Sequence, residues 1–342
     1  MAMLKLGIIG AGTIFQNQIL VLAECTDKYK VVSVLDCDER ALLRAKETLT
    51  NLEMAQGVDF CASLQQFLTC DMDAVLIATP PKTHFQLGLE CLKAGKNVFM
   101  EKPAAHSMEE LEILYGQAQE NKVVFYVAFH AAFSVEVEWF LKNQRLLAEK
   151  YGFGKISKVY CGFYDPYLVD GKILLGKEKL EGSYVDSAVN ALSVCGRLLP
   201  IGGFSTTIHQ EKADSNGTTI VSNTLFGDGE RTILVDTGWG YAINRKRTVL
   251  QFENSKNQLL LDHTNQRIVY QSVMEEKEIL SSFHALEESP IEEEKILFKD
   301  DSIPRLQRQY LGAFLDFLEV CKGNKGKQIS GKRVHGLLFE NI

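Results

Sequence analysis

The sequence predicts an α/β N-terminal part built on a doubly wound parallel sheet, followed by an α+β part with an open antiparallel sheet and helices on one face. Up to about residue 128, short apolar runs alternate with amphipathic segments, as in the strand–helix–strand units of parallel sheets. Further along, short alternating strands are joined by turn pairs. We therefore predict two domains, 1–128 and 129–342.

The strands expected in the N-terminal part are continuous apolar runs, which is typical of strands covered by helices on both faces. They read KLGIIG, KVVSVLD, DAVLIAT, NVFME and VVFYVAF. Helix signals lie between them. We predict Asp38 as an N-cap and Gly95 as the residue just past a helix end, and Ser107 with Glu110 has capping-box spacing.

The C-terminal part begins with helical segments near 135–150 and 183–199 and continues as alternating strands. These strands are KISKVYCGF, TTIVSNTLF, RTILVDTGWG, TVLQFENS, NQLLLDH and RIVYQS, with turn pairs such as Asn216-Gly217, Asp228-Gly229 and Ser255-Lys256. A final amphipathic helix ends near Gly323, and the acidic segment 287–295 is interpreted as a solvated loop. A sheet with one uncovered face predicts a homodimer or homotetramer formed through that face.

Composition excludes several classes of function. The net charge is −7, and the lysines and arginines are scattered, which argues against a nucleic acid or an anionic membrane as partner. The eight cysteines include no C-x-x-C pair, so we expect reduced thiols and a cytoplasmic location. We expect no signal peptide, no membrane span and, because the seven histidines form no ligand cluster, no metal site.

The segment GIIGAGTIF follows a strand and opens a helix. Gly10 and Gly12 occupy the first two positions of a dinucleotide fingerprint, where the first allows a tight turn and the second a close approach of backbone to pyrophosphate. Phe15 stands where the third glycine is expected, and this weakens the motif. We assign Thr13 and Ile14, at the helix start, to the same phosphate-binding turn. The context predicts a Rossmann-type sheet.

The second strand ends in Asp36, at a distance along the chain that suits a carboxylate bonded to the adenosine ribose. Cys37 and Asp38 follow it in place of an arginine. A carboxylate at this point repels the 2′-phosphate of NADP. The sequence therefore predicts NAD as the cofactor in preference to NADP.

Two further loops follow the ends of predicted parallel strands, where ligands bind in such sheets. One is ATPPKTHF at 78–85 and the other is MEKP at 100–103. The second directs a lysine cation into the crevice, although a surface lysine is the ordinary alternative. The cofactor contacts assigned to these loops are Thr79, Pro80, His84, Glu101 and Lys102.

The stretch GSYVDSAVNALS places Asp186, Asn190 and Ser193 on one face of a helix, beside an apolar stripe. Short polar side chains are poor helix formers. The face is either solvated, which is the more common situation, or part of a site. The residues alone leave both interpretations open.

These motifs together resemble the Gfo/Idh/MocA group of oxidoreductases, named for glucose-fructose oxidoreductase and inositol dehydrogenase. The resemblance implies that Lys102 lies beside the nicotinamide and the reacting hydroxyl, and that Asp186 lies in the substrate site. Many members carry a histidine, the proton acceptor, at the position of Asn190. VDSAVNALS is similar instead to the L-arabinose and D-galactose 1-dehydrogenases, and AFHAAFSVEVE at 128–138 is similar to their stretch containing the equivalent of His130.

The expected function is the NAD-dependent oxidation of a sugar or sugar-like polyol, most simply an aldose at C1 to its lactone. Lys102 and Asp186 are the expected catalytic residues, and Asn190 and His130 the expected substrate contacts. Trp239 either supports a sugar ring or packs inside the sheet. The alternatives are a cyclitol, diol or imine dehydrogenase of the same fold, and a regulator that binds its ligands without catalysis.

Overall fold

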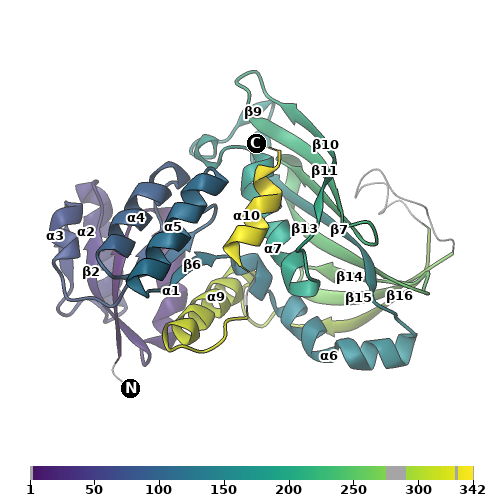
Figure 1. Ribbon diagram of the computed structural model, residues 1–342, viewed down its shortest axis with the longest axis horizontal. Coiled ribbons are helices and arrows are strands. Elements are labelled where there is room, and N and C mark those ends of the chain that lie inside the picture. The colour runs from purple at the N-terminus through teal and green to yellow at the C-terminus, as the bar shows by residue number, and fades with distance from the viewer. Residues whose placement is uncertain (1–2, 275–289, 328–329, 342) are drawn as a thin grey trace. The chain divides into compact units, whose positions relative to one another are not determined.

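The computed structural model describes residues 3–274, 290–327 and 330–341 (Figure 1). Contacts within the chain divide it into two compact units. Unit 1 comprises Met1–Phe129 and Tyr310–Lys327, and unit 2 comprises His130–Gln309 and Gln328–Ile342. Each unit contains one main sheet, and the two sheets differ in strand direction.

Unit 1 is built on a six-stranded sheet in the order β3-β2-β1-β4-β5-β6. Every neighbouring pair is parallel, so the predicted doubly wound sheet is confirmed. The strands are β1 (Leu4–Ile9), β2 (Tyr29–Leu35), β3 (Asp59–Cys61), β4 (Ala74–Ile77), β5 (Asn97–Glu101) and β6 (Phe125–Ala128). The strand order reverses between β1 and β4, and this switch point is where ligands bind in open α/β sheets.

Helices cover both faces of this sheet. Phe99 of β5 lies against Phe314 of helix α9, with ring centroids 5.7 Å apart, whereas the next residue, Met100, lies against Gly88 of α4. Successive strand residues point to opposite faces, so α9 and α4 are on different sides. The helices are α1 (Thr13–Leu22), α2 (Glu39–Asn51), α3 (Leu64–Leu68), α4 (His84–Lys93), α5 (Met108–Asn121) and α9 (Arg305–Cys321), with short 3₁₀ turns at Ala23–Cys25 and Pro81–Thr83.

The helix ends follow the predicted signals closely. Asp38 caps α2 by accepting a hydrogen bond from a backbone N–H of its first turn, and Gly95 follows α4 with φ +71°. The Ser107 hydroxyl accepts from the backbone N–H of Glu110 at 3.2 Å. The Glu110 carboxylate accepts from the N–H of His106, one residue earlier than a capping box requires.

Helix α9 corrects the predicted division of the chain. We expected every residue after 129 to lie in the second domain, but Tyr310–Lys327 lies in unit 1. Phe314 packs edge-on against Tyr29, and Tyr126 donates a hydrogen bond to Asp316 at 2.9 Å. The strands of unit 1 present aromatic side chains on this face, and a helix from the far end of the chain buries them.

Unit 2 contains an eight-stranded sheet in the order β10-β11-β12-β7-β13-β14-β15-β16. The expectation of a purely antiparallel sheet is corrected at one pair, because β7 and β12 run parallel. The chain reaches β12 only after a helical crossover and a hairpin, and a crossover permits parallel pairing. The strands are β7 (Ile156–Pro166), β10 (Ser205–Ala213), β11 (Thr219–Gly227), β12 (Thr232–Gly238), β13 (Gly240–Phe252), β14 (Gln258–Asp262), β15 (Arg267–Val273) and β16 (Ile291–Lys299), with a small separate hairpin of β8 (Leu168–Val169) and β9 (Lys172–Ile173).

Several elements of unit 2 have no counterpart in the sequence prediction: the strands β10 and β16, the small hairpin β8–β9 and helix α10 (Gly331–Phe339). The acidic segment interpreted as a loop is a strand from Ile291 onwards, and residues 287–289 lie outside the described residues. Glu292–Glu294 are exposed on β16 at the edge of the sheet. Charged side chains discourage edge-to-edge pairing with other chains, and they also hide the apolar alternation that predicts a strand.

Helices α6 (Val135–Tyr151) and α7 (Val189–Leu198) follow the predicted helical segments, and α7 packs on β7. The sulfur atoms of Cys161 on β7 and Cys195 on α7 lie 3.5 Å apart in the core between them. A single π-helical turn, Tyr184–Ala188, precedes α7, and 3₁₀ turns lie at His130–Phe133 and Glu178–Leu180. The predicted helix over 183–199 is therefore two segments of different winding.

The opposite face of the sheet in unit 2 carries an apolar cluster. Its members are Tyr160, Tyr164, Leu234, Val249, Leu260 and Val269, each at most 7% exposed. We expected a second subunit to bury this face. These side chains are already buried in the single chain, so their burial does not depend on a partner, and the oligomeric state stays a prediction.

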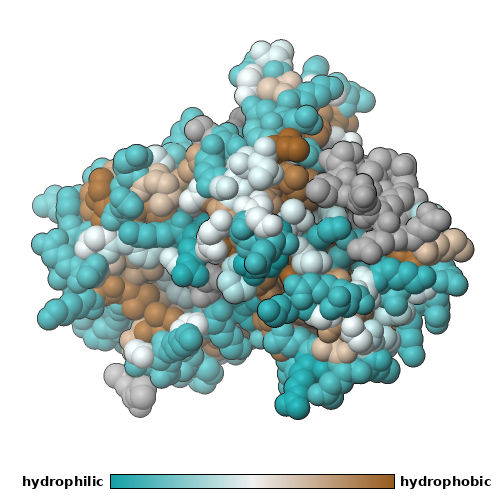
Figure 2. All heavy atoms as spheres, turned by 45° about the vertical axis from the view of Figure 1, so that its right-hand side comes forward, coloured by the Kyte–Doolittle hydropathy of each residue, from teal (hydrophilic) through white to brown (hydrophobic). Residues whose placement is uncertain are grey.

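The surface in Figure 2 is mostly hydrophilic, with separate hydrophobic patches. In the part of the chain that the structure describes, no helix is both long enough and apolar enough to span a bilayer.

Candidate cofactor and substrate sites

The glycine-rich turn of unit 1 follows β1 at the switch point of the sheet. Gly10 has φ +98°, a backbone conformation that residues other than glycine rarely adopt. A Cβ at this position would lie 2.8 Å from the backbone carbon and oxygen of Ala78 at the end of β4. Gly10 also donates a hydrogen bond to the Leu35 carbonyl at 2.8 Å. The turn therefore passes so close to its neighbours that only glycine fits.

Gly12 is the N-cap of α1, and its requirements differ from those of Gly10. Its φ is −78°, no side chain caps the helix, and a Cβ here would meet no atom within 4 Å. Thr13 and Ile14, which follow, are exposed. Helix N-terminal N–H groups that lack an acceptor attract anions, so this end of α1 fits a pyrophosphate. Phe15, in place of the third glycine, is 1% exposed and belongs to the core.

Asp36 lies directly after β2 and fixes the same turn. One carboxylate oxygen accepts from the N–H of Ala11 at 2.7 Å, and the other accepts from the N–H of Asp38 at 2.9 Å. The sequence suggested only a contact to the ribose, whereas the geometry adds a structural task, because Ala11 lies between the two glycines. A carboxylate has about four acceptor positions, which leaves room for ribose hydroxyls.

His84 corrects one of the expected cofactor contacts. The ring is fully buried, with Nε2 lying 2.8 Å from the Thr79 carbonyl and Nδ1 lying 2.7 Å from the Pro103 carbonyl. Burial lowers the pKa of His84, against the effect of these two carbonyls. His84 therefore lies between the two loops that follow β4 and β5, where a neutral imidazole donates to one of these two carbonyls at a time. Thr79 is half-buried and Pro80 is exposed.

Glu101 and Lys102 come at the end of β5. Glu101 is 6% exposed, and its carboxylate accepts hydrogen bonds from the Gln18 side chain of α1 and from the backbone N–H of Lys102. The bond from Gln18 connects the loop after β5 to α1, the helix that begins at the glycine-rich turn. Lys102 is half-buried at the carboxyl end of the strand. Hydrogen bonds thus connect the glycine-rich turn to Asp36 and helix α1 to Glu101.

The polar stripe of unit 2 is not a solvated face. Asp186 is 8% exposed, Ser193 is fully buried and Asn190 is half-buried. Asn190 donates to the Asp186 carbonyl at 3.1 Å, and the Ser193 hydroxyl donates to the Asn190 carbonyl at 2.7 Å. The Asn190 Oδ1 atom is buried and has no hydrogen-bond partner among the described residues. Asn190 therefore retains an acceptor for a ligand hydroxyl.

The π-helical turn at Tyr184–Ala188 determines where this stripe begins. An extra residue in one turn rotates the side chains that precede it relative to those that follow, and such turns occur often at functional sites. Asp186 and Ser187 both lie in this turn and are buried. Nothing in the apolar periodicity of the sequence distinguishes a π-turn from the first turn of an α-helix.

A cluster of charged and polar groups, which was not predicted from the sequence, lies next to this turn. Asp165, 1% exposed at the end of β7, accepts hydrogen bonds from the Ser187 hydroxyl at 3.1 Å and from Lys246 Nζ at 2.9 Å. Its other oxygen accepts from the Asn244 side-chain amide, whose oxygen accepts in turn from Arg305 at 3.0 Å. We name Asp165, Lys246, Asn244 and Arg305 the charged cluster.

Electrostatics join the charged cluster to the predicted site. Burial lowers the pKa of Lys246, whereas Asp165 and Asp186 act in the opposite direction. Burial also raises the pKa of Tyr167, and the same two carboxylates add to that effect. Asp186 thus acts on two side chains that the sequence analysis did not identify. Asn244 and Lys246 alternate along β13 as an ordinary half-buried strand would, so a single sequence offers no signal for them.

The two remaining predicted substrate contacts differ in accessibility. His130 is 7% exposed in the 3₁₀ turn that begins unit 2. Trp239 is fully buried, and its ring lies edge-on to Tyr167 with centroids 5.7 Å apart. A sugar ring needs an exposed aromatic face, so the prediction of a Trp239 platform is wrong and its alternative, packing within the sheet, describes the structure.

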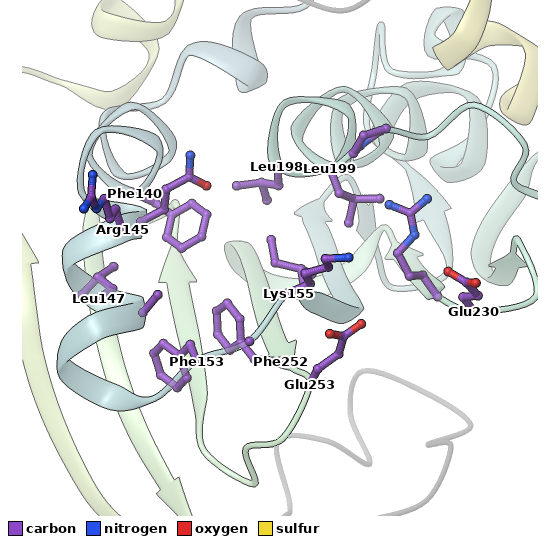
Figure 3. A pocket seen from close by; sticks show the side chains of 16 residues that line it. Phe140, Arg145, Leu147, Phe153, Lys155, Leu198, Leu199, Glu230, Phe252 and Glu253 are labelled. Carbon is purple, nitrogen blue, oxygen red and sulfur yellow. The ribbon is translucent and has the colours of Figure 1, made fainter.

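A separate hollow in unit 2 contains none of these residues. Phe140, Phe153 and Phe252 form its apolar wall, and Lys155 and Glu253 are among its charged residues (Figure 3). The rings of Phe153 and Phe252 stack with centroids 4.1 Å apart. Across the described ranges 3–274, 290–327 and 330–341, no group of three or more His, Cys, Asp or Glu side chains could hold a metal ion.

Comparison with known families agrees with the geometry of unit 1. Residues 4–129 match the family model GFO_IDH_MocA, described as an oxidoreductase family with an NAD-binding Rossmann fold. This part of the chain is therefore similar to the Gfo/Idh/MocA oxidoreductases. The matched range includes the glycine-rich turn, Asp36 and both loops that follow β4 and β5.

Curated proteins similar in sequence align with about half of this chain. Inositol 2-dehydrogenase 3 of Saccharopolyspora erythraea is 27% identical over 163 residues, 47% of this chain and 45% of its own length. An uncharacterised oxidoreductase of Escherichia coli is 30% identical, with 48% of each chain covered. The scyllo-inositol 2-dehydrogenase (NADP⁺) of Bacillus subtilis is 27% identical, over 43% of this chain and 38% of its own. The chain thus spans less than half the length of these relatives.

Solved structures share the fold over nearly the whole chain. The UDP-N-acetylglucosamine 3-dehydrogenase of Acidithiobacillus ferrooxidans superposes with a TM-score of 0.73, covering 99% of this chain and 97% of its own, at 16% identity. An oxidoreductase of Agrobacterium radiobacter, solved with NAD⁺, L-tartaric acid and magnesium, gives 0.75 over 99% and 95% at 12% identity. At these identities the likeness extends to the fold alone.

Proposed function

We propose that the chain is an NAD-dependent oxidoreductase that acts on a sugar or a sugar-like polyol. The proposal depends on the polar groups that the two units present. In unit 1, which matches the Gfo/Idh/MocA model, two neighbouring strands are followed by loops that both contact His84, and one of these loops contains Lys102. In unit 2, Asp186 and several hydrogen-bonding side chains lie at one π-turn. Units 1 and 2 would then serve cofactor and substrate respectively. The curated inositol dehydrogenases support a polyhydroxylated substrate.

In unit 1, the residues that would hold NAD are those of the glycine-rich turn and Asp36, with the N-terminal N–H groups of α1 facing the pyrophosphate. When bound, NAD supplies the hydride acceptor. Lys102, at the carboxyl end of β5, would hold the reacting hydroxyl by hydrogen bond and take part in moving its proton. Glu101 keeps the loop in place through its bonds to Gln18 and to the backbone of Lys102.

In unit 2, Asp186 would accept a hydrogen bond from the substrate and is the second candidate for its proton. Asn190 cannot change protonation state in the working pH range, and its role would be to orient a hydroxyl through the buried Oδ1 atom, which has no partner among the described residues. The anomeric hydroxyl of an aldose is more acidic than an ordinary alcohol. An amide at this position therefore favours oxidation at C1 to a lactone over oxidation of a cyclitol ring carbon.

A substrate panel tests the proposal. We expect NAD reduction, followed by nicotinamide absorbance, with one or more members of a panel of aldoses, cyclitols and diols, and the highest kcat/KM with an aldose. A cyclitol as the best substrate would replace the aldose assignment but leave the dehydrogenase in place. Calorimetric binding of NAD and a sugar with no turnover in either direction would contradict the enzyme and favour a ligand-binding regulator.

The cofactor preference is tested separately. Asp36 follows β2, and its carboxylate is held near the glycine-rich turn by Ala11. A 2′-phosphate placed beside that carboxylate costs at least about 1.4 kcal/mol, so NAD should bind at least about tenfold more tightly than NADP. The measurement is calorimetry with both cofactors, and the Asp36→Ser variant should lose most of the difference. Equal affinities for the wild type would contradict the prediction.

A further inference from the structure

Lys246 has more hydrogen-bond donors than the protein uses. An ammonium group has three N–H donors, and Nζ donates to Asp165 Oδ2 at 2.9 Å. The Phe163 ring lies 5.5 Å from Nζ and offers only its π-face. Throughout the described residues, no second acceptor lies within hydrogen-bond distance of Nζ. Two donors of a side chain that is only 15% exposed therefore have no acceptor from the described part of the chain.

The groups around Lys246 come from three directions. Asp165 on β7 and Asp186 in the π-turn supply two negative charges, and Arg305, which precedes unit 1's part of α9, supplies a second positive charge. Lys246 Nζ and the hydroxyl of Ser187, the residue next to Asp186, both donate to Asp165 Oδ2, so Lys246 and Asp186 place a donor and an acceptor in the same part of unit 2. The four charges balance, so this region suits a neutral ligand with alternating hydroxyls better than a strongly anionic one.

Stability alone does not explain this arrangement. Buried ion pairs lose hydration, and an apolar pair of similar volume is often as stable or more stable. Ionisable groups with shifted pKa values gather at functional sites. The Asp165 carboxylate already accepts three hydrogen bonds, from Ser187, Asn244 and Lys246, out of about four that it can accept, so it serves mainly to hold Lys246.

We propose that Lys246 is a substrate-binding residue: its ammonium donates to one hydroxyl of a vicinal diol while Asp186 accepts from the adjacent hydroxyl. The inference rests on the proposed function and narrows the substrate class to polyols that carry such a diol. A hydroxyl both donates and accepts, so neighbouring hydroxyls match a neighbouring donor and acceptor. A site of this kind rejects an analogue that lacks the hydroxyl, because its own polar groups then stay unpaired.

A cycle of enzyme and substrate changes tests the contact. The kinetic constants of wild type, Lys246→Met and the control Lys299→Met are measured with the best polyol of the panel and its monodeoxy analogues. We expect Lys246→Met to raise KM about 10-fold to 100-fold with a smaller change in kcat, as for a lost hydrogen bond to a charged group. Lys299 is exposed on the same sheet, at 50%, and its variant should behave as wild type.

The deoxy analogues separate binding from folding. For the wild type, kcat/KM with one deoxy analogue should be about 10-fold to 100-fold lower than with the parent polyol. For Lys246→Met the two values should be nearly equal, because the partner of the missing hydroxyl is already absent. A structural role would leave the penalties of all analogues equal in the two proteins, and that result would overturn the inference while the dehydrogenase stands. Wild type that oxidises no polyol would overturn both.

Lys246→Arg covers the case in which Lys246→Met does not fold. The arginine keeps the charge opposite Asp165 but moves the donors, so the same analogue should again lose its penalty, with a thermal unfolding midpoint close to wild type. An unchanged penalty in a folded Lys246→Arg protein would also contradict the contact.

Discussion

Lys102→Ala should lower kcat by about 10² to 10⁴, the usual contribution of a group that moves a proton in the transition state. Lys102 is half-buried at the carboxyl end of β5, and its backbone N–H is held by Glu101. NAD affinity should change little, because the pyrophosphate and ribose contacts belong to other residues. Steady-state kinetics and calorimetry with NAD measure the two quantities.

The control for this variant is Lys93→Ala, an exposed lysine on α4 in the same unit, which should keep wild-type kinetics. Lys102→Arg distinguishes charge from proton transfer, since arginine keeps a cation but does not deprotonate in proteins. Near wild-type turnover in Lys102→Ala would show that Lys102 is an ordinary surface lysine.

Gly10→Ala and Gly12→Ala should both weaken NAD binding, but only Gly10→Ala should also lower the stability of the protein. Alanine at Gly10 must adopt φ +98° and contact the backbone of Ala78, at a cost of about 1 to 2 kcal/mol for the left-handed conformation and about 1 to 3 kcal/mol for the overlap. We expect a lower unfolding midpoint and NAD binding weakened by more than tenfold.

Alanine at Gly12 keeps an ordinary φ of −78° and enters open space. The free energy of unfolding should change by less than about 1 kcal/mol, yet the methyl group would stand where the pyrophosphate approaches α1. NAD affinity should fall at least about tenfold, measured by calorimetry beside urea unfolding. A Gly12→Ala protein that binds NAD as wild type does would remove the cofactor from this helix end.

The sequence predicted most of unit 1 well because five of its six strands are continuous apolar runs with clear helix signals between them. Strand β3 and helix α3 are short, and β3 is only partly buried, so neither was predicted. Asp38 and Gly95 act as expected. Unit 2 was harder to predict. The edge strands β10 and β16 are mostly exposed, so they lack the apolar alternation on which prediction depends, and the parallel β7–β12 pair is set by topology rather than by any local residue.

The residues of the candidate sites also differ in how well the sequence predicts them. Gly10, Gly12 and Asp36 belong to a motif of fixed spacing, and local sequence identifies them. Lys246 and Asp165 are far apart in the sequence and meet only because β7 and β13 are neighbours. Their polar character reads as ordinary strand alternation until the fold is known. Trp239 is the opposite case. Its position in the sequence suggested a contact with a sugar ring, but the side chain is fully buried.

Helix α9 has a consequence for the order in which the chain acquires its structure during synthesis. Tyr29, Phe99 and Tyr126 are in place once about 129 residues have been made, but the helix that buries them begins its part of unit 1 at Tyr310. At about 5 to 20 residues per second, the nascent unit 1 would wait on the order of ten seconds or more with an aromatic surface open to water. A ribosome-bound fragment ending before α9 should therefore be a substrate for chaperones, whereas the finished chain supplies its own cover.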